Sequence, residues 1–389
     1  MSLLDFLGRR PAHIRFPSIA AMERAGRRRL PKFAWDFMAG GIGREVGKAR
    51  NLSDLDTVTF TPRYVVDYDY PADLSSTLFG KWSAPFGPGP VGLQDLVWPG
   101  AQAHVLRAAA DHNLPAGFSV YATASIEEAA GIVGPNLWFQ QYPMAETDIE
   151  QDLLGRYRSV GGDVLIVTMD VPHGTRRERD IGNGLSIPPR QDLLTYWQAA
   201  IRPSWSVATL RNGMPRFKTV ERYIPPDTPP QSSMQLLGSL AAGHVGPERL
   251  RQYRDQWNGK LVIKGVLHQE DLKHCLDAGV DGIVVSNHGG RQLDGAVTAP
   301  EVLPSLRQYA GGKLSIIADG GVRSGLDIAR MLALGADHVF LGRALAFAVA
   351  AAGAEGPALA MDILKQEMVD VLSQLGCQDY RDLTKYLTD

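Results

Sequence analysis

Cysteine is scarce in this chain, whose 389 residues include only Cys275 and Cys377. Two cysteines are too few for a disulfide framework, so a reducing cytosol fits better than secretion. The opening residues, MSLLDFLGRRPAHIRF, lack the apolar core of a signal peptide, and no run of about 18 apolar residues predicts a membrane span. The formal net charge of −2 gives no argument for nucleic acid as a partner.

Metal-binding patterns are missing as well. The sequence has no paired-cysteine ligand set and no two-histidine helical motif, so we expect no metal. The composition, 44% apolar and 21% charged, is that of an ordinary globular protein with a large core.

Short apolar, β-branched segments recur along the chain, and a longer helical pattern follows each of them. Eight such segments are expected as strands, at 85–91, 116–120, 137–141, 164–168, 261–265, 282–286, 315–318 and 338–341. The last four are continuous apolar runs, which is typical of strands buried on both faces. Eight alternating units predict an α/β fold, the (β/α)8 TIM barrel.

The chain is expected to form one domain, residues 1–389, with two additions to the barrel at 81–385. Residues 1–80 form an N-terminal helical cap that includes the basic stretch AAMERAGRRRLPKFAWDFMAGG. Residues 178–248 interrupt the barrel after its fourth strand. An insertion of that length is too long for a simple connection and indicates a functional segment.

Reactive side chains cluster where the expected strands end, which is where barrel enzymes place their chemistry. His288 and Arg291 follow the sixth strand, in SNHGGRQLDG. A lone histidine is usually only a surface residue, but the planar fork of Arg291 suits a carboxylate. A base beside a carboxylate clamp is what oxidation of a 2-hydroxy acid requires, and Asp170 could stabilise the protonated imidazole.

Glycine-rich loops with an arginine follow the seventh and eighth strands, as ADGGVRSG and LGRA. Each loop could simply be a tight turn, but together they match the phosphate-binding site that is usual after strands seven and eight of this architecture. Lys264, at the end of the fifth strand, could form a rim ion pair or place a fixed positive charge beside a reduced flavin. We expect flavin mononucleotide (FMN) as the cofactor.

These motifs, together with ALGA and FLGRA, resemble the FMN-dependent 2-hydroxy acid oxidoreductases, which include glycolate oxidase, lactate oxidase and mandelate dehydrogenase. The resemblance runs from about residue 18 to 385 and is greatest to the mandelate dehydrogenase branch, through NLWFQQY, RERDIGNGLSIP and RPSWSVATLRNGMP. It implies oxidation of an (S)-2-hydroxy acid to the 2-oxo acid by a homotetramer, cytoplasmic or peripheral on the inner face of the cell membrane.

The resemblance also implies roles for individual residues. His288 would be the base with Asp170 as its partner, and the substrate would be held by Arg177, Arg291, Tyr142, Tyr121 and Phe37. The flavin ring would be held by Pro90, Val91, Gly92, Ser119, Gln140, Thr168, Lys264 and Ser286. The ribityl phosphate would be held by Asp319, Gly320, Gly321, Arg323, Gly342 and Arg343.

Two positions depart from the family pattern. Phe37 stands where the family commonly has tyrosine, so one hydroxyl is missing from the substrate pocket. Losing a hydrogen bond to a charged group costs roughly 1.5–3 kcal/mol, which favours a bulky, aromatic acid over a small one. Val91 stands where threonine is usual, which removes a hydroxyl near the flavin.

We expect a quinone as the electron acceptor, with oxygen as the alternative. Oxidases of the family more often resemble alanine at Gly92, and segment 193–218 combines Trp197 and Trp205, which we expect to contact the bilayer, with arginines as a bilayer interface would. That segment resembles the membrane-associating part of mandelate dehydrogenases, but it could equally be a lid or a subunit contact. Other classes of answer are a flavin-binding pseudoenzyme and a flavin barrel such as type 2 isopentenyl diphosphate isomerase, for which no second diphosphate grip is visible.

Overall fold

The computed structural model describes residues 11–185, 192–225, 227–229, 236, 239–241 and 243–388. Eight parallel strands form one sheet, in the order β1-β8-β7-β6-β5-β4-β3-β2. They are β1 Phe86–Pro88, β2 Ala116–Ser119, β3 Leu137–Gln141, β4 Val164–Thr168, β5 Lys260–Lys264, β6 Gly282–Val285, β7 Ser315–Ala318 and β8 His338–Leu341. The two edge strands lie beside each other, so the sheet curls into a nearly closed barrel, and the predicted (β/α)8 fold is confirmed.

The strands are buried on both faces, which explains their continuous apolar sequence. One face of each strand fills the barrel interior, where Trp138, Ile166, Val262, Ile317 and Phe340 form a compact cluster. The other face packs under the surrounding helices as part of the larger core. The barrel is therefore solid, and its chemistry must lie at one of its ends.

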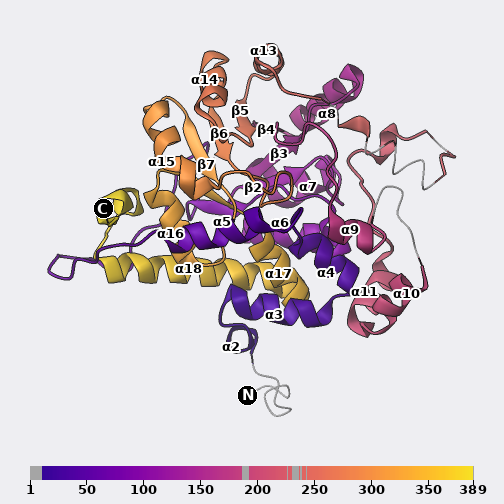
Figure 1. Cartoon of the computed structure of the whole chain (residues 1–389), viewed down its shortest axis with the longest axis horizontal. Helices are drawn as coiled ribbons and strands as arrows, with labels where there is room; N and C mark the ends of the chain where they lie inside the picture. Colours follow the sequence, from indigo (N-terminus) through magenta and orange to yellow (C-terminus); the bar gives the residue numbers. More distant parts are fainter. Residues whose placement is uncertain are drawn as a thin grey trace.

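The helices that follow the strands form the outer layer, as Figure 1 shows. They are α6 Ala101–Asp111, α7 Ile126–Val133, α8 Thr147–Ser159, α13 Pro247–Gln256, α14 Gln269–Asp277, α15 Ala299–Ala310, α16 Gly325–Ala333, α17 Arg343–Ala352 and α18 Gly356–Leu375. Short 3-10 turns are η1 Gln94–Leu96, η2 Gly134–Asn136, η4 Gly353–Glu355 and η5 Tyr380–Tyr386. Ser125 and Thr298 start α7 and α15 with capping boxes.

The run from α17 to α18 is the one candidate membrane span in the described part of the chain, judged by length and hydropathy alone. It is broken at η4, and 67% of its most apolar window is buried inside the protein. Both helices pack on the barrel and on the N-terminal cap, as core helices do.

Within the described residues, the helices that precede the barrel are α2 Ala12–Arg15, α3 Ile19–Arg29, α4 Lys32–Ala39 and α5 Val46–Asp56. The basic stretch expected to be helical is two helices, because Pro31 lies between α3 and α4 and starts the second. Helix α3 packs along α17, and α4 lies beside the inserted segment, as Figure 1 shows.

The inserted segment contains α9 Glu178–Gly182, α10 Leu193–Ala200, α11 Pro203–Asn212 and the turn η3 Glu221–Tyr223. Residues 186–191, 226, 230–235, 237, 238 and 242 of the expected insertion lie outside the described residues. Helices α10 and α11 are fixed to the cap, because Phe33 N donates to Gln198 Oε1 at 2.9 Å and Arg202 Nε donates to Leu30 O at 3.0 Å.

Candidate active site

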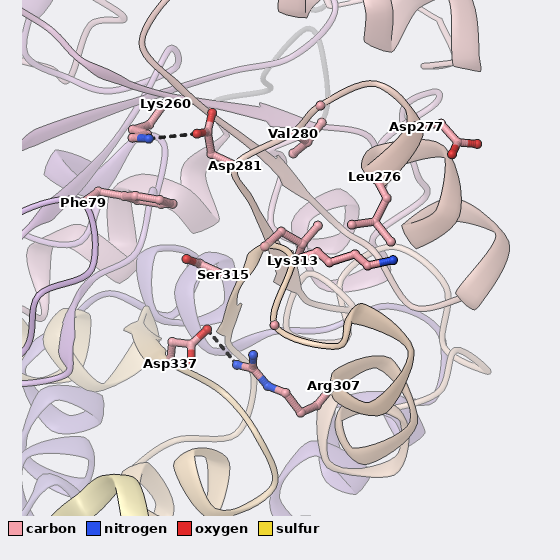
Figure 2. A pocket seen from close by; sticks show the side chains of 13 residues that line it. Phe79, Lys260, Leu276, Asp277, Val280, Asp281, Arg307, Lys313, Ser315 and Asp337 are labelled. Carbon is pink, nitrogen blue, oxygen red and sulfur yellow. Dashed lines mark hydrogen bonds and ion pairs between the residues drawn. The ribbon is translucent and has the colours of Figure 1, made fainter.

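The N-terminal end of the barrel carries a surface hollow, shown in Figure 2, which lies between the loops that lead into β5 to β8. Its charged residues are largely neutralised by one another: Lys260 pairs with Asp281 at 3.0 Å, and Arg307 pairs with Asp337 at 2.7 Å. Phe79 lies at its edge and packs on the barrel interior. Paired charges stabilise the rim but leave little to bind a ligand, so we place the chemistry at the opposite end.

At the C-terminal end, His288 and Asp170 lie together although 118 residues separate them in the chain. His288 Nδ1 is 3.0 Å from Asp170 Oδ1. Burial acts to raise the pKa of Asp170, but the His288 ring and Lys264 outweigh it and the pKa lies below its usual value. An ionised carboxylate only accepts, so Nδ1 carries the ring proton and Nε2 is left as a base.

The backbone after β6 explains the sequence His-Gly-Gly-Arg. His288 has a φ of 56°, which is rare for a side chain of its size, and Gly289 and Gly290 continue in the left-handed region. A Cβ on Gly289 would lie 2.7 Å from Arg343 Nη1, and one on Gly290 would lie 2.5 Å from Lys48 N. The two glycines therefore let the loop bend sharply between the base and Arg291.

Two arginines of the site are held by the C-terminal end of α4. Arg291 Nη1 donates to Phe37 O at 2.7 Å and to Gly40 O at 3.0 Å. Arg343 donates to Met38 O at 3.2 Å and to the same Gly40 O at 2.7 Å. The last carbonyls of a helix carry partial negative charge, so α4 orients both guanidinium groups.

Positive charge accumulates here without matching acids. Burial and, after it, the repulsion of neighbouring Arg177 lower the pKa of Arg291 to about 10. Burial also lowers the pKa of Arg343, and the repulsion of Arg291 and of Arg323 adds to this lowering. Among the described residues, the only ion pair of these four arginines is Arg177 with Asp180, at 3.8 Å. Uncompensated buried charge is costly, so the site is built for anionic ligands.

The residues expected around a flavin ring line the same end of the barrel. Lys264 Nζ is buried and donates to Ser286 Oγ at 2.6 Å and to Asp319 Oδ2 at 2.8 Å. Gln140 Nε2 donates to Thr168 Oγ1 at 2.9 Å. Pro90, Val91 and Gly92 follow β1, and Ser119 ends β2. Asp319 Oδ1 is buried and has no hydrogen-bond partner in the structure. Because buried polar atoms normally have a partner, this oxygen fits a contact with a bound cofactor.

The expected phosphate residues lie at two helix N-termini. Gly320, Gly321 and Arg323 lead from β7 into α16, and Gly342 caps α17, whose first residue is Arg343. Backbone N–H groups and the positive end of a helix suit a phosphate. Three donors of Arg343 are engaged by carbonyl oxygens, the third by Gly289 O at 2.8 Å. Its phosphate contact stays a prediction that depends on its remaining N–H groups.

Aromatic rings form the remaining wall. Tyr121 and Tyr142 are 5.6 Å apart between ring centroids, and the Arg291 guanidinium lies 5.4 Å from the Phe37 ring. Burial raises the pKa of Tyr121 to about 12, and burial together with Asp170 raises the pKa of Tyr142. Both phenols therefore remain protonated and can donate hydrogen bonds near neutral pH.

The structure brings the predicted catalytic and substrate residues to one end of the barrel and adds residues that the sequence did not indicate. The carbonyl oxygens of Met38 and Gly40 could not be predicted, because no side-chain pattern marks a backbone acceptor. Phe217 packs on Tyr121 from the inserted segment, where no motif singles it out.

Comparison with known proteins identifies the class. Residues 26–389 match the model of the FMN-dependent dehydrogenase family, and the chain belongs to that family. It is 36% identical to an L-lactate dehydrogenase of Caulobacter vibrioides (strain NA1000 / CB15N) over 370 residues, which is 95% of this chain and 96% of the relative. The L-lactate dehydrogenase of Caulobacter sp. (strain K31) is 36% identical over 361 residues, with 92% of this chain and 94% of the relative covered.

Solved structures point to the same group. A structure described as the monotopic membrane protein (S)-mandelate dehydrogenase superposes with a TM-score of 0.90 at 33% identity, covering 95% of this chain and 98% of that one. A mandelate oxidase superposes with a TM-score of 0.81 at 31% identity, covering 96% and 98%. The chain is therefore an FMN-dependent oxidoreductase of the 2-hydroxy acid dehydrogenase and oxidase group, and its cofactor is FMN.

Proposed function

We propose that this protein oxidises a bulky (S)-2-hydroxy acid, of the aromatic, mandelate-like kind, to the corresponding 2-oxo acid. The observation that carries the proposal is the His288–Asp170 pair, 3.0 Å apart, near Arg291, which forms no ion pair among the described residues, and its neighbour Arg177. The arginines hold the carboxylate of the acid. Nε2 of His288 takes a proton, and Asp170 stabilises the imidazolium that results.

Bound FMN supplies the two-electron acceptor for this reaction. The acid loses two electrons and two protons: the imidazole of His288 holds one proton, and the other would leave with the electron pair to the bound FMN. Lys264 offers a buried positive charge where a reduced flavin becomes anionic. Tyr142, protonated and half-buried near Arg291, donates a hydrogen bond to a substrate oxygen.

The preference for a bulky side group depends on the aromatic wall. Phe37 has no hydroxyl to offer to a small acid, and burying a phenyl group gains roughly 1.5–3 kcal/mol. The test is anaerobic flavin bleaching with lactate, with long-chain aliphatic 2-hydroxy acids and with (S)-mandelate. The second-order rate constant should be largest for (S)-mandelate, and a clear preference for lactate would refute the substrate assignment.

We further propose a peripheral membrane contact through α10 and α11, where a quinone accepts the electrons. Trp197 is 63% exposed, and these two helices and the residue between them also expose Leu193, Leu194, Tyr196, Ile201, Val207 and Leu210. Large exposed apolar patches mark interaction sites. The (S)-mandelate dehydrogenase of similar structure is described as a monotopic membrane protein, which supports the proposal.

One expectation about this surface is wrong. Trp205 was predicted to contact the bilayer, but it is 5% exposed. Its indole packs edge-on against Phe33, with ring centroids 5.4 Å apart, and its Nε1 donates to Val97 O at 3.1 Å. Trp205 therefore anchors α11 to the protein, and Trp197 is left as the tryptophan of the apolar surface.

The second candidate is an oxidase, favoured by the likeness to the mandelate oxidase structure. Gly92 bears on the choice, because a Cβ there would lie 3.1 Å from Tyr121 O and 3.2 Å from Tyr121 Cβ. The space beside Tyr121 therefore suits glycine better than the alanine that oxidases of the family more often resemble at this position, which favours the dehydrogenase. Mixing the reduced protein with oxygen or with a soluble quinone analogue decides between the two: rapid reoxidation by oxygen alone would identify an oxidase.

A further inference from the structure

We infer that Phe217, on the inserted segment, is a specificity-determining residue, because it positions the Tyr121 ring against the side group of the substrate. The inference rests on the proposed function and names the part of the insertion that reaches the substrate pocket. Nothing in the motifs marks Phe217, so the assignment depends on its contacts.

The first observation is a chain of ring contacts. Phe217 meets Tyr121 edge-on, with 5.8 Å between ring centroids and 78° between planes. Tyr121 in turn meets Tyr142 at 5.6 Å and 38°. Tyr142 is close enough to Asp170 for that carboxylate to raise its pKa. Phe217 is therefore two ring contacts away from Tyr142, which lies near the catalytic Asp170.

The second observation is that Phe217 is firmly held. Its carbonyl oxygen accepts from Val220 N at 3.0 Å. Thr219 is fully buried and donates to Ala124 O at 3.0 Å, and Arg156 Nη1 donates to Thr219 O at 2.7 Å. These bonds tie the residues after Phe217 to the barrel rather than to the exposed helices α10 and α11, so its ring is a fixed wall.

The third observation concerns what Tyr121 supports. Its carbonyl oxygen accepts from Leu93 N at 2.9 Å, next to Gly92, and its ring is restrained on two sides by Phe217 and Tyr142. An edge-to-face aromatic pair prefers one orientation over others. The backbone of Ala241 also bonds Tyr121, so removing Phe217 takes away one of several restraints on this residue. The looser ring makes weaker contact with a phenyl group, but the carboxylate clamp and the base are unchanged.

The experiment compares three variants of the FMN-loaded protein. Phe217→Leu removes the ring and keeps an apolar side chain, Phe217→Tyr keeps the ring, and Met214→Leu is a control on an exposed residue of the same segment. Anaerobic stopped-flow bleaching is measured over a range of (S)-mandelate and of (S)-lactate concentrations. Flavin content and the unfolding midpoint are measured for each variant to show that the fold is intact.

We expect Phe217→Leu to lower the second-order rate constant for mandelate about fivefold, the order of magnitude that one aromatic pair contributes. The loss should lie in apparent affinity, with the limiting reduction rate and the lactate constant nearly unchanged. Phe217→Tyr should behave as wild type, and so should Met214→Leu.

Two results would overturn the assignment: unchanged rate constants for both acids, or an equal loss for both acids. The assignment is also overturned if two results occur together. In that case Phe217→Leu loses flavin or fails to fold, and Phe217→Tyr does not keep the wild-type ratio of rate constants. Failure of the wild-type protein to be bleached by any 2-hydroxy acid is a different outcome, which refutes the proposed function itself.

Discussion

Arg291 shows at the scale of one residue how this site is prepared for an anion. Its Nη1 is engaged by two carbonyl oxygens of the α4 end, which leaves Nε and Nη2 for a substrate. Both lie along one edge of the planar guanidinium, the edge that forms a two-point contact with a carboxylate. Burial and Arg177 lower the pKa of Arg291, and a bound carboxylate offsets that effect.

Replacing Arg291 by lysine keeps a positive charge but loses both the fork and the tie to the α4 carbonyls. We expect Arg291→Lys to weaken binding of an unreactive aromatic acid by at least about tenfold, because charge-assisted hydrogen bonds contribute roughly 1.5–3 kcal/mol. The measurement is a titration that follows the flavin absorption spectrum. Equal affinity in both proteins would move the clamp to Arg177.

A substitution at Phe37 tests the substrate preference by adding a hydroxyl group that should favour small acids. Its carbonyl oxygen holds Arg291, so the backbone contact survives a change of side chain. Phe37→Tyr restores one hydroxyl and should shift the ratio of rate constants towards lactate by about tenfold, within the range of one hydrogen bond to a charged group. A ratio that is unchanged, or that moves towards mandelate, would show that this position does not set the preference.

At the scale of elements, strand β8 carries an unusual residue in the barrel interior. His338 is 0% exposed, neither of its ring nitrogens has a hydrogen-bond partner in the structure, and its ring lies 5.9 Å from Trp138 and 5.8 Å from Phe340. Burial lowers the pKa of His338 from 6.5 to about 3. The folded protein therefore keeps this imidazole neutral.

The sign of the resulting pH dependence follows from linkage. Between about pH 6.5 and pH 3 the unfolded chain binds a proton at His338 that the folded protein does not bind, so stability falls with falling pH. The slope approaches about 1.4 kcal/mol for each pH unit. His338→Leu should remove this part of the acid sensitivity in denaturant unfolding measured from pH 7 to pH 4. Parallel curves for the two proteins would contradict the prediction.

The elements also show what the sequence can and cannot predict. Strands β5 to β8 lie within a residue of their predicted positions, because continuous apolar runs report burial on both faces. Strand β1 is only three residues long, since Gly89 and Pro90 end it early. The burial of Trp205 was missed because an amphipathic segment does not reveal which of its aromatic rings faces the protein.

In the candidate site too, the sequence predicts some of the residues and not others. His288, Arg291 and Lys264 were predicted because reactive side chains stand at strand ends, where their position in the fold follows from the strand itself. The α4 carbonyls that hold Arg291 and Arg343 come from a segment more than 250 residues away in sequence. Such contacts depend on how the cap docks, and no local pattern encodes them. The expectation of a homotetramer stays a prediction.

At the scale of the whole molecule, helix α4 of the cap packs against α9 and α10 of the inserted segment, as Figure 1 shows. Gln198 and Arg202 bind α10 and α11 to the N-terminal helices, and Trp205 adds a bond to the loop before α6. The exposed apolar side chains therefore stand on a rigid base. A surface of this kind can rest on a bilayer without any helix crossing it.

The membrane contact predicts a result for vesicles. The intact protein should co-sediment with anionic vesicles in a salt-sensitive way, because one amphipathic surface gives only modest attachment. Changing Leu193, Trp197 and Leu210 to serine should abolish co-sedimentation and quinone reduction, while (S)-mandelate still bleaches the flavin. The matched control changes Thr195, between them in sequence, to serine. Equal sedimentation of all three proteins would contradict the proposal.

The central claim is that His288 is the base of a 2-hydroxy acid oxidation at this end of the barrel. Its most direct test is the anaerobic rate of flavin reduction by (S)-mandelate in the wild-type protein and in His288→Ala. General base catalysis contributes about 10²–10⁴-fold, so the variant should keep its flavin and be reduced at least about a hundredfold more slowly. Reduction of the fully flavin-loaded variant at near the wild-type rate would contradict the account.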